Sequence, residues 1–539
     1  MISIADGLGL LIGIVVIATV ADRLRIAYPI LLVIAGIGVA LIPTHHRIEL
    51  EPELVLLVFL PPLVYDASLD TSVREIRTHL RPILLLAVGL VLATMVAVAA
   101  IIHTLVGGMG WAVAFALGAI VSPPDSVAAT QIAGKLGLPR HLVTILGGEG
   151  LMNDATALTA YQVAVAAVGT SFTVGDVIGK FAFAVVVGVA IGLAVGWFGC
   201  RMLQFTETPV IENTMLLILP FAAYLPADKM GASGVLAVVA TGLYFGRYGS
   251  GSLTAAARLQ QREIWDLIVF LLTGMSFLLV GLELRPILDS LVNRESGSLV
   301  VEGLAVVGVV IVIRMVWMFG ATALPGGERL FAVARHPGRS WRETTVVGWS
   351  GMRGAVSLAA ALALPQSFPQ RDLLVFLTFA VIVVTLVGQG LTLPPLIRRL
   401  GLVSRDEQEM LLVAEARRRL TMIALSQIDD LARAGRFPPV IVERIRTGYE
   451  SQLARIDRRL EAMSSGSAEV GDGEDGGHPA AGTDSDLGAE RELRGLVIAS
   501  ERSELDQLLV RRKVSERVAG GVRAALDVDV DVDETTMRP

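Results

Sequence analysis

Two short polar stretches, Ser122-Pro123-Pro124-Asp125 and Gly148-Glu149-Gly150-Leu151-Met152-Asn153-Asp154, each interrupt a long apolar segment between residues 109 and 168. A charged side chain at the centre of a bilayer costs about 2.5 to 3.5 kcal/mol on insertion scales, so three carboxylates at this depth need a reason. Proline lacks a helical amide donor and clashes with the preceding turn, so the first stretch predicts an unwound helix. We expect the rest of the chain to be a scaffold for this region.

The composition identifies a polytopic membrane protein. The 539 residues are 53% hydrophobic and only 18% charged, and the mean hydropathy is +0.65, which is too apolar for a soluble protein. The net charge of -6 combines acids in the segment after Leu400 with arginines in short loops, and it indicates no nucleic-acid partner. Cys200 is the one cysteine, which excludes an intrachain disulfide. Met1 to Arg25 lacks a basic leading region, so we expect a first spanning helix rather than a cleaved signal.

Apolar runs predict about thirteen transmembrane helices, and the fold class is therefore all-α. A helix of about 20 residues crosses a hydrocarbon core of roughly 30 Å. Runs of this kind centre near residues 13, 36, 60, 93, 120, 155, 188, 218, 239, 274, 311, 353 and 384. The run Leu54 to Leu69, with Pro61-Pro62, and the glycine-rich run around Arg353 are short or interrupted, so we expect both inside the bundle.

The distribution of basic residues predicts the orientation. Cytoplasmic loops retain Lys and Arg. One set of alternate loops holds eighteen basic residues, from Arg23 to Arg405, and the other holds six, from Arg47 to Arg371. The N-terminus is therefore expected outside and the C-terminus in the cytoplasm.

The chain changes character after residue 400, so we divide it into a transmembrane domain (1–400) and a cytoplasmic tail. The tail is expected to contain a helical extension (401–463), a disordered Gly/Ser/Asp/Glu-rich linker (464–489) and a final helical segment (490–539). Within these, Ser404 to Ala434, Pro438 to Met463 and Glu490 to Leu526 have helical periodicity. A regulatory or dimer-supporting role is favoured over a ligand-binding domain, and the sequence indicates no tail ligand.

Thirteen spans divide into six, a linker and six, as expected for a transporter with two inverted six-helix repeats. The fifth span of one half carries Ser122, Pro123 and Pro124, and the fifth span of the other carries Gly351-Met352-Arg353-Gly354. Interruptions at matching positions point to a substrate site where two broken helices cross. Asp125 would compensate amino-terminal helix ends there, and Arg353 carboxyl-terminal ends. The alternative is that proline and glycine only permit a kink or close packing.

The helical geometry separates two of the three carboxylates. Asp154 lies about 140° around a helix from Glu149, so the two acids face different surroundings. Arg314 stands alone among apolar residues and needs a buried partner. We assign Glu149 and Arg314 to a structural ion pair, which leaves Asp154 as the candidate for transport chemistry.

A free carboxylate in the membrane can act as an exchange site. Burial disfavours its charged form and a bound cation favours it, so a proton and a cation compete for Asp154. Asp66, at the end of Phe59 to Asp66, could reach the same cavity. The alternative for Asp66 is a carboxylate at a helix end that meets the cytoplasmic interface.

The available ligands restrict the function further. Carboxylate oxygens suit hard cations and not soft metals, and the sequence holds no His/Cys cluster, Walker sequence or nucleotide loop, so we expect no cofactor. An intramembrane hydrolase with paired aspartates is a second hypothesis, but Asn153, Arg314 and Arg353 beside broken helices favour ion binding. A transport-dead sensor that uses the tail as its output is a third.

At these residues the sequence resembles the sodium/proton exchanger family, in its cation/proton antiporter-1 branch, over roughly Leu8 to Arg399. Four segments carry the resemblance together. They are Phe59 to Asp66 (family FLPPLLFE), Gly148 to Asp154 (GESLxND), Gly351 to Ser357 (GLRGAVS), and Gly388-Gln389-Gly390 with Leu393-Pro394.

The resemblance implies a thirteen-helix fold, a homodimer and elevator-like alternating access in a bacterial-type plasma membrane. It implies that Asp154 binds the cation and the proton, with Asn153 beside it, Asp125 near the site, and Arg353 at the crossing. It also implies the pair of Glu149 with Arg314. The Asn-Asp sequence suggests one proton per monovalent cation and no net charge moved, so we expect an electroneutral antiporter for sodium, with potassium or lithium as alternative cations.

The chain departs from the family pattern at three places. Gly150 stands where the family has serine, Pro124 and Ser126 flank Asp125 where threonine and proline are usual, and Asp66 stands where glutamate is common. The missing hydroxyl can be replaced by a carbonyl, by water, or by Ser122 or Ser126. If that hydroxyl matters, Gly150→Ser is expected to tighten sodium binding.

Overall fold

The computed structural model describes residues 4–24, 26–42, 52–69, 71, 73–136, 138–168, 174–249, 251, 253–291, 294–323, 340–402, 407–464, 484–510 and 522. These residues form α-helices and two short π-helical segments, and none of them lies in a β-strand. The all-helical fold class is confirmed. The chain divides into two compact units, Met1–Val403 and Ser404–Pro539, close to the predicted boundary at residue 400.

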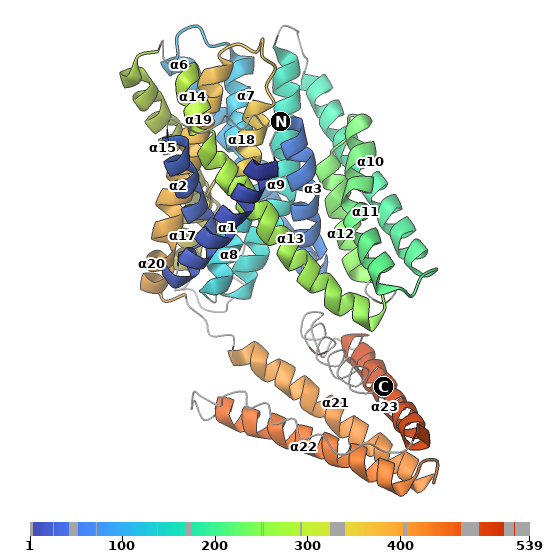
Figure 1. Cartoon of the computed structure of the whole chain (residues 1–539). Helices are drawn as coiled ribbons and strands as arrows, with labels where there is room; N and C mark the ends of the chain where they lie inside the picture. Colours follow the sequence, from blue (N-terminus) through green and yellow to red (C-terminus); the bar gives the residue numbers. More distant parts are fainter. Residues whose placement is uncertain are drawn as a thin grey trace. The chain divides into compact units, whose positions relative to one another are not determined.

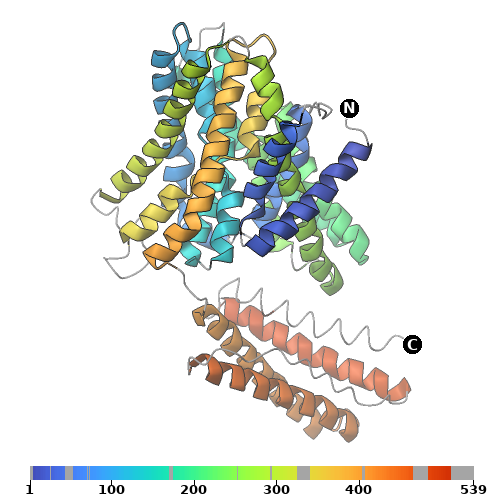
Figure 2. The same ribbon diagram turned by 60° about the vertical axis from the view of Figure 1, so that its left-hand side comes forward.

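The first unit is a bundle of helices in which α13 runs obliquely across its neighbours (Figures 1 and 2). In chain order its elements are α1 (Ile4–Leu24), α2 (Tyr28–Ala40), α3 (Pro52–Leu69), α4 (Val73–Thr78), α5 (Leu80–Leu84), η1 (Leu85–Leu90), α6 (Val91–Leu105), α7 (Trp111–Val121), α8 (Ser126–Lys135), α9 (Arg140–Ala167), α10 (Val174–Leu203), α11 (Pro209–Lys229), α12 (Gly234–Tyr248), α13 (Ala255–Leu282), α14 (Leu284–Ser290), α15 (Ser296–Ala323), α17 (Ser340–Trp349), α18 (Ala355–Leu362), α19 (Arg371–Val383), η3 (Val384–Gln389) and α20 (Gly390–Leu400).

The helices agree in position with the predicted spans. Within the described ranges, eight helices are long and apolar enough to cross a membrane, and two shorter apolar helices accompany them. Each of the thirteen predicted centres falls in a helix, except residue 353, which falls in the gap between α17 and α18. The count of thirteen spans and their arrangement as inverted repeats stay predictions.

Two helices are interrupted where prolines and glycines predicted it. The first gap separates α7 from α8, at residues 122–125, and the second separates α17 from α18, at residues 350–354. The two gaps meet, because the backbone amide of Asp125 donates a hydrogen bond of 2.6 Å to the carbonyl of Met352. The predicted crossing of broken helices is confirmed.

The third span was predicted to be short or interrupted, and the structure shows a short apolar helix without a break. Helix α3 continues through Pro61 and Pro62, which are both buried. Proline is tolerated within a transmembrane helix where neighbouring helices surround the freed backbone groups, and α3 packs against α11, α12, α13 and α18. The expectation that this helix is interior agrees with that packing.

A close helix contact fixes α13, which later contributes to the site. A Cβ atom at Gly36 of α2 would lie 2.5 Å from the carbonyl oxygen of Leu278 and 2.9 Å from the Cα of Gly281 on α13. Only glycine permits this separation, because the backbones of two helices touch directly. Helix α13 is thereby held against α2 along the same stretch that carries its polar residues.

The second unit contains three helices, α21 (Glu407–Arg433), α22 (Pro439–Ser464) and α23 (Asp484–Val510). Gly435, with φ of 66°, makes the left-handed turn between α21 and α22. Ile428, Ile445 and Val497 contribute one buried side chain from each helix to a shared core. The apolar stripes that suggested helices in the tail therefore pack on one another.

The third tail helix begins earlier than predicted. It starts at Asp484 rather than at Glu490, so the predicted linker 464–489 is wrong at its carboxyl end. Acidic residues are generally favourable in the first turn of a helix, where they oppose the macrodipole. The remainder of that linker, 465–483, and the predicted helical residues after 510 other than 522 lie outside the described residues.

Candidate functional site

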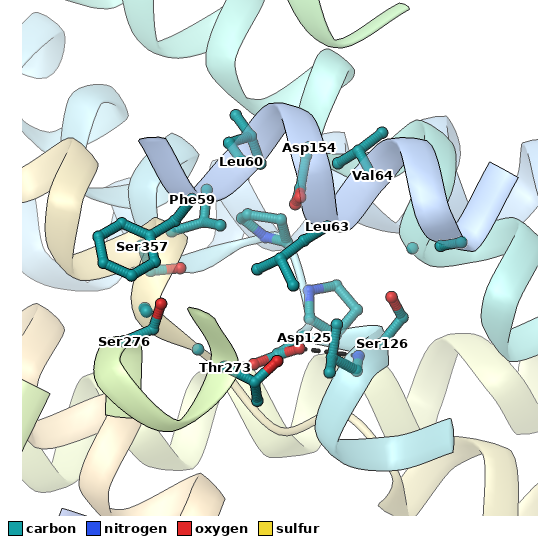
Figure 3. A pocket seen from close by; sticks show the side chains of 18 of the residues that line it. Phe59, Leu60, Leu63, Val64, Asp125, Ser126, Asp154, Thr273, Ser276 and Ser357 are labelled. Atoms are coloured by element: carbon teal, nitrogen blue, oxygen red, sulfur yellow. Dashed lines mark hydrogen bonds between the residues drawn. The ribbon is translucent and has the colours of Figure 1, made fainter. Parts of the chain in front are cut away.

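A cavity lies where the two broken helices meet α3, α9 and α13 (Figure 3). Its lining combines apolar side chains from α3 with carboxylates and hydroxyls from the other elements. The lining residues are Phe59, Leu60, Leu63, Val64 and Ala67; Pro123, Pro124, Asp125, Ser126 and Val127; Gly150, Leu151 and Asp154; Thr273, Ser276 and Phe277; and Gly354, Ala355, Val356, Ser357 and Ala359. The cavity therefore joins Asp125 and Asp154, which are 29 residues apart in the sequence, at one place.

Asp154 is an acid for which the described part of the chain provides no partner. It projects from the middle of α9 into the cavity and is half-buried. Among the residues that the structure describes, no donor makes a hydrogen bond or an ion pair with its carboxylate. Charged groups inside a membrane normally pair with one another or with backbone groups, so this carboxylate is available to a ligand from the cavity.

Asp125 has a structural role at the crossing. Its Oδ1 accepts hydrogen bonds from the backbone amides of Val127, at 2.8 Å, and Ala128, at 3.5 Å. These amides belong to the first turn of α8, whose partial positive charge a carboxylate stabilises. Asp125 therefore compensates an amino-terminal helix end and also lines the cavity.

Gly354 makes room for the Asp125 carboxylate. A Cβ atom at Gly354 would overlap the Oδ2 and Cγ atoms of Asp125, and Gly354 itself precedes the first residue of α18. The carboxylate thus lies against the beginnings of both α8 and α18. A glycine is required at this crossing because of the close approach.

We expect Gly354→Ala to displace Asp125 and to lower the free energy of unfolding by about 1 to 3 kcal/mol, the usual cost of overpacking. The thermal unfolding midpoint of the detergent-solubilised protein measures this. Gly308→Ala in α15 is the matched control, because a Cβ there has no atom within 4 Å. Equal midpoints for the two variants would contradict the close approach at Gly354.

Arg353 fills the crossing and is 1% exposed. Its Nε donates to the carbonyl of Val121 at 2.9 Å and its Nη2 to the carbonyl of Ser122 at 3.2 Å. Its Nη1 donates to the carbonyl of Gly351, and its backbone amide donates to Thr385 Oγ1 at 3.0 Å. The guanidinium thus donates hydrogen bonds to carbonyls at the carboxyl-terminal end of α7, where a positive charge is favourable.

Glu149 and Arg314 lie together in the interior. Arg314 Nη1 donates to Glu149 Oε1 at 2.6 Å and Nη2 donates to Oε2 at 2.9 Å, and both side chains are almost fully buried. Arg314 Nη2 also donates to the carbonyl of Val347 near the end of α17, at 3.1 Å. Two parallel hydrogen bonds between guanidinium and carboxylate are the strongest geometry for such a pair, and here they join α9 to α15.

Asn153 and Ser122 both donate hydrogen bonds to backbone carbonyls at or next to the unwound segment. Asn153 is fully buried and its Nδ2 donates to the carbonyl of Pro124 at 2.9 Å. The Ser122 hydroxyl donates to the carbonyl of Ala119 at 3.0 Å, so it closes the end of α7. Neither residue lines the cavity. The Nδ2 of Asn153 thus holds the unwound segment, and the expectation that Asn153 binds the cation stays a prediction.

Asp66 does not belong to the cavity. It lies on α3 between the lining residues Val64 and Ala67, but it is not among the lining residues itself. That Asp66 could reach the site of Asp154 stays a prediction.

Two hydroxyl residues of α13 line the cavity and were not singled out from the sequence. Thr273 and Ser276 are both buried and both face the cavity (Figure 3). They are three residues apart, so they share one face of the helix. Two hydroxyls at this spacing within the otherwise apolar run from Phe270 to Phe277 were the available signal.

Comparisons with known proteins identify the family of the chain. The family described as "Sodium/hydrogen exchanger, transmembrane" matches residues 10–399. An uncharacterized Na(+)/H(+) exchanger of Mycobacterium tuberculosis is 33% identical over 532 residues, which cover 96% of this chain and 94% of the relative. A sodium, potassium, lithium and rubidium/H(+) antiporter of Bacillus subtilis is 30% identical over 411 residues, covering 71% of this chain and 60% of the relative.

A solved structure shares the fold. The sodium proton antiporter MjNhaP1 of Methanocaldococcus jannaschii, at pH 8, superimposes with a TM-score of 0.56 at 16% identity, covering 73% of this chain and 97% of that protein. The hydrolase hypothesis does not agree with these findings, because the family consists of transporters. The chain belongs to the sodium/hydrogen exchanger family and is a multi-pass membrane protein that exchanges cations for protons.

Proposed function

We propose that this chain exchanges sodium for protons and that Asp154 binds the two in turn. The observation that carries this is the unequal pairing of three intramembrane acids. Glu149 is bound by Arg314 and Asp125 caps α8, whereas Asp154 has no partner among the described residues. A bound proton and a bound cation each neutralise a carboxylate, and they exclude one another. Occupancy by one therefore requires release of the other.

The ligand chemistry supports a hard monovalent cation as the cargo. The polar groups that line the cavity are carboxylates and hydroxyls, from Asp125, Asp154, Thr273, Ser276 and Ser357 among others. Oxygen ligands of this kind suit alkali cations. We assign the charge-neutralising contact to Asp154.

One unpaired carboxylate supports an electroneutral cycle. If Asp154 alone changes its proton occupancy, one proton is exchanged for one monovalent cation and no net charge crosses the membrane. Glu149 cannot contribute without breaking both of its hydrogen bonds to Arg314. The stoichiometry we propose is therefore one to one.

The contacts of the crossing support movement of the broken helices as one body. Asp125 is bonded to the second broken helix through Met352, and Asn153 of α9 is bonded to the first through Pro124. The ion pair of Glu149 with Arg314 connects α15 to the same group of helices through α9. We propose that these elements move together relative to α13 to expose the site alternately, in an elevator-like manner. We also propose a homodimer in the plasma membrane, with the N-terminus outside and the C-terminus in the cytoplasm.

The test is proton flux in proteoliposomes, followed with an internal pH-sensitive dye when sodium, potassium or lithium is added. We expect a response to sodium that is the same with the membrane potential clamped and unclamped. A response that changes with the clamp would contradict the one-to-one exchange. The absence of a response to any of the three cations would contradict the proposed function.

Potassium/proton exchange is the second candidate. It is favoured by the relative from Bacillus subtilis, which is named for exchange of sodium, potassium, lithium and rubidium. In the same assay, a potassium response equal to the sodium response would replace our choice of cation. It would leave the role of Asp154 unchanged.

A further inference from the structure

The space that a side chain at position 150 would occupy is filled by a side chain from another helix. A Cβ atom at Gly150 would overlap both the hydroxyl oxygen and the Cβ of Ser126. Gly150 belongs to α9 and Ser126 is the first residue of α8. The two residues are therefore in direct contact, and the absence of a side chain at position 150 is what permits the contact.

The contact places the Ser126 hydroxyl in the lining of the cavity that also contains Asp154. Gly150 and Asp154 are four residues apart, one turn along the same face of α9, and both line the cavity. Ser126 also lines it and directly follows Asp125 in the chain (Figure 3). A hydroxyl held against Gly150 thus lies one helical turn from Asp154, within the same cavity wall.

In the described part of the chain, the hydroxyl of Ser126 has no hydrogen-bond partner. Thr130 binds the backbone carbonyl of Ser126 and not its side chain, and no described residue makes a hydrogen bond with the Ser126 hydroxyl. By contrast, the hydroxyls of Ser122 and Ser68 each donate to a carbonyl of their own helix. Ser126 therefore has an oxygen available in the cavity.

We propose that Ser126 supplies a hydroxyl ligand to the cation that Asp154 binds, and that Gly150 is required because Ser126 occupies its side-chain space. This inference rests on the proposed function. Its consequence is that a hydroxyl can reach this position from residue 126 or from residue 150, but not from both. The expectation that Gly150→Ser tightens sodium binding is overturned, because the added side chain collides with Ser126.

The first test is Ser126→Ala. We expect the apparent KM for sodium to rise about tenfold, which corresponds to the loss of one contact to a charged group, while the maximal rate changes much less. Ser68→Ala is the matched control, because its hydroxyl is buried but lies outside the cavity. An apparent KM for Ser126→Ala equal to that of the wild type would overturn the inference.

The second test exchanges the two residues. Gly150→Ser alone is expected to reduce sodium-driven proton flux strongly, and Gly150→Ser combined with Ser126→Gly is expected to restore an apparent KM near that of the wild type. Gly147→Ser, on the same helix, is the control, because a Cβ there has no atom within 4 Å. Full activity of Gly150→Ser alone, or a folded double variant with an unimproved apparent KM, would overturn the inference.

These outcomes separate the inference from the proposed function. If the wild type produces no cation-driven proton flux, the proposed function fails. If the wild type transports and Ser126→Ala keeps its apparent KM, only the role of Ser126 fails. Thermal unfolding of each variant shows whether a loss of flux reflects misfolding, and Ser126→Ala, which only removes an oxygen, decides the case if a Gly150 variant does not fold.

Discussion

Asp154→Asn is expected to reduce cation-driven proton flux in proteoliposomes to the level of protein-free vesicles. The substitution keeps the shape of the side chain and removes the group that takes up a proton. Glu149 is paired with Arg314 and Asp125 accepts from a backbone amide of α8, whereas Asp154 has no partner among the described residues. The fold should persist, because no described contact depends on this carboxylate, and the unfolding midpoint should stay at or above that of the wild type.

The matched control for this variant is Asp372→Asn. Asp372 is 54% exposed and lies 3.8 Å from Arg371, outside the cavity. We expect this control to retain wild-type flux. If Asp154→Asn retained cation-driven proton flux, the assignment of the exchange site to Asp154 would be wrong.

Glu149→Gln is expected to have the largest effect on stability. It leaves the Arg314 charge, which is 1% exposed, without its carboxylate. Breaking a buried pair by removal of one partner costs about 3 to 5 kcal/mol, because an uncompensated charge remains in the interior. The midpoint of thermal unfolding in detergent should fall accordingly, and the amount of folded protein in membranes should fall with it.

A double substitution separates the charge from the packing. Glu149→Leu with Arg314→Met removes both charges, and we expect it to recover much of the stability that Glu149→Gln loses, because apolar residues often replace a buried pair without cost. Glu492→Gln is the control, since its partner Arg436 lies at 2.7 Å but both side chains are more than half exposed. Such a surface pair contributes about 0 to 1 kcal/mol. A normal unfolding midpoint for Glu149→Gln would refute the structural role of the pair.

Helical periodicity explains why the acids of α9 could be separated in advance. A residue's direction around a helix depends only on its number, so Glu149 and Asp154 had to face different neighbours. The isolated Arg314 then indicated the partner of Glu149. The two interruptions were predictable as well, because Pro123-Pro124 and Gly351 to Gly354 weaken a helix by local chemistry alone.

Other features depend on contacts between helices, which one sequence does not reveal. Pro61 and Pro62 have the same local chemistry as Pro123 and Pro124, yet α3 stays continuous because its neighbours enclose it. Asp66 is not among the residues that line the cavity, although it lies on α3 beside them. A side chain added at position 150 would collide with Ser126 only because α8 packs on α9. The sequence does not reveal this packing, and it therefore suggested that a serine at position 150 would tighten sodium binding.

The same limit applies to Thr273 and Ser276. Their spacing shows that they share a face of α13. The position of α13 itself depends on its close contact with α2 at Gly36 and Gly281. Hydroxyl residues are frequent in transmembrane helices, where they commonly bond to their own backbone. Their position in the cavity could be recognised only once the fold was known.

Competition at Asp154 is tested most directly by the apparent KM for sodium, measured at a series of pH values that are equal on both sides of the membrane. If a proton and a cation compete for Asp154, the apparent KM rises as the pH falls, approaching about tenfold per pH unit, and the rate at saturating sodium changes less. An apparent KM that does not depend on pH would contradict competition at one carboxylate. A rise steeper than about tenfold per unit would mean that a second proton is displaced, and would contradict the one-to-one exchange.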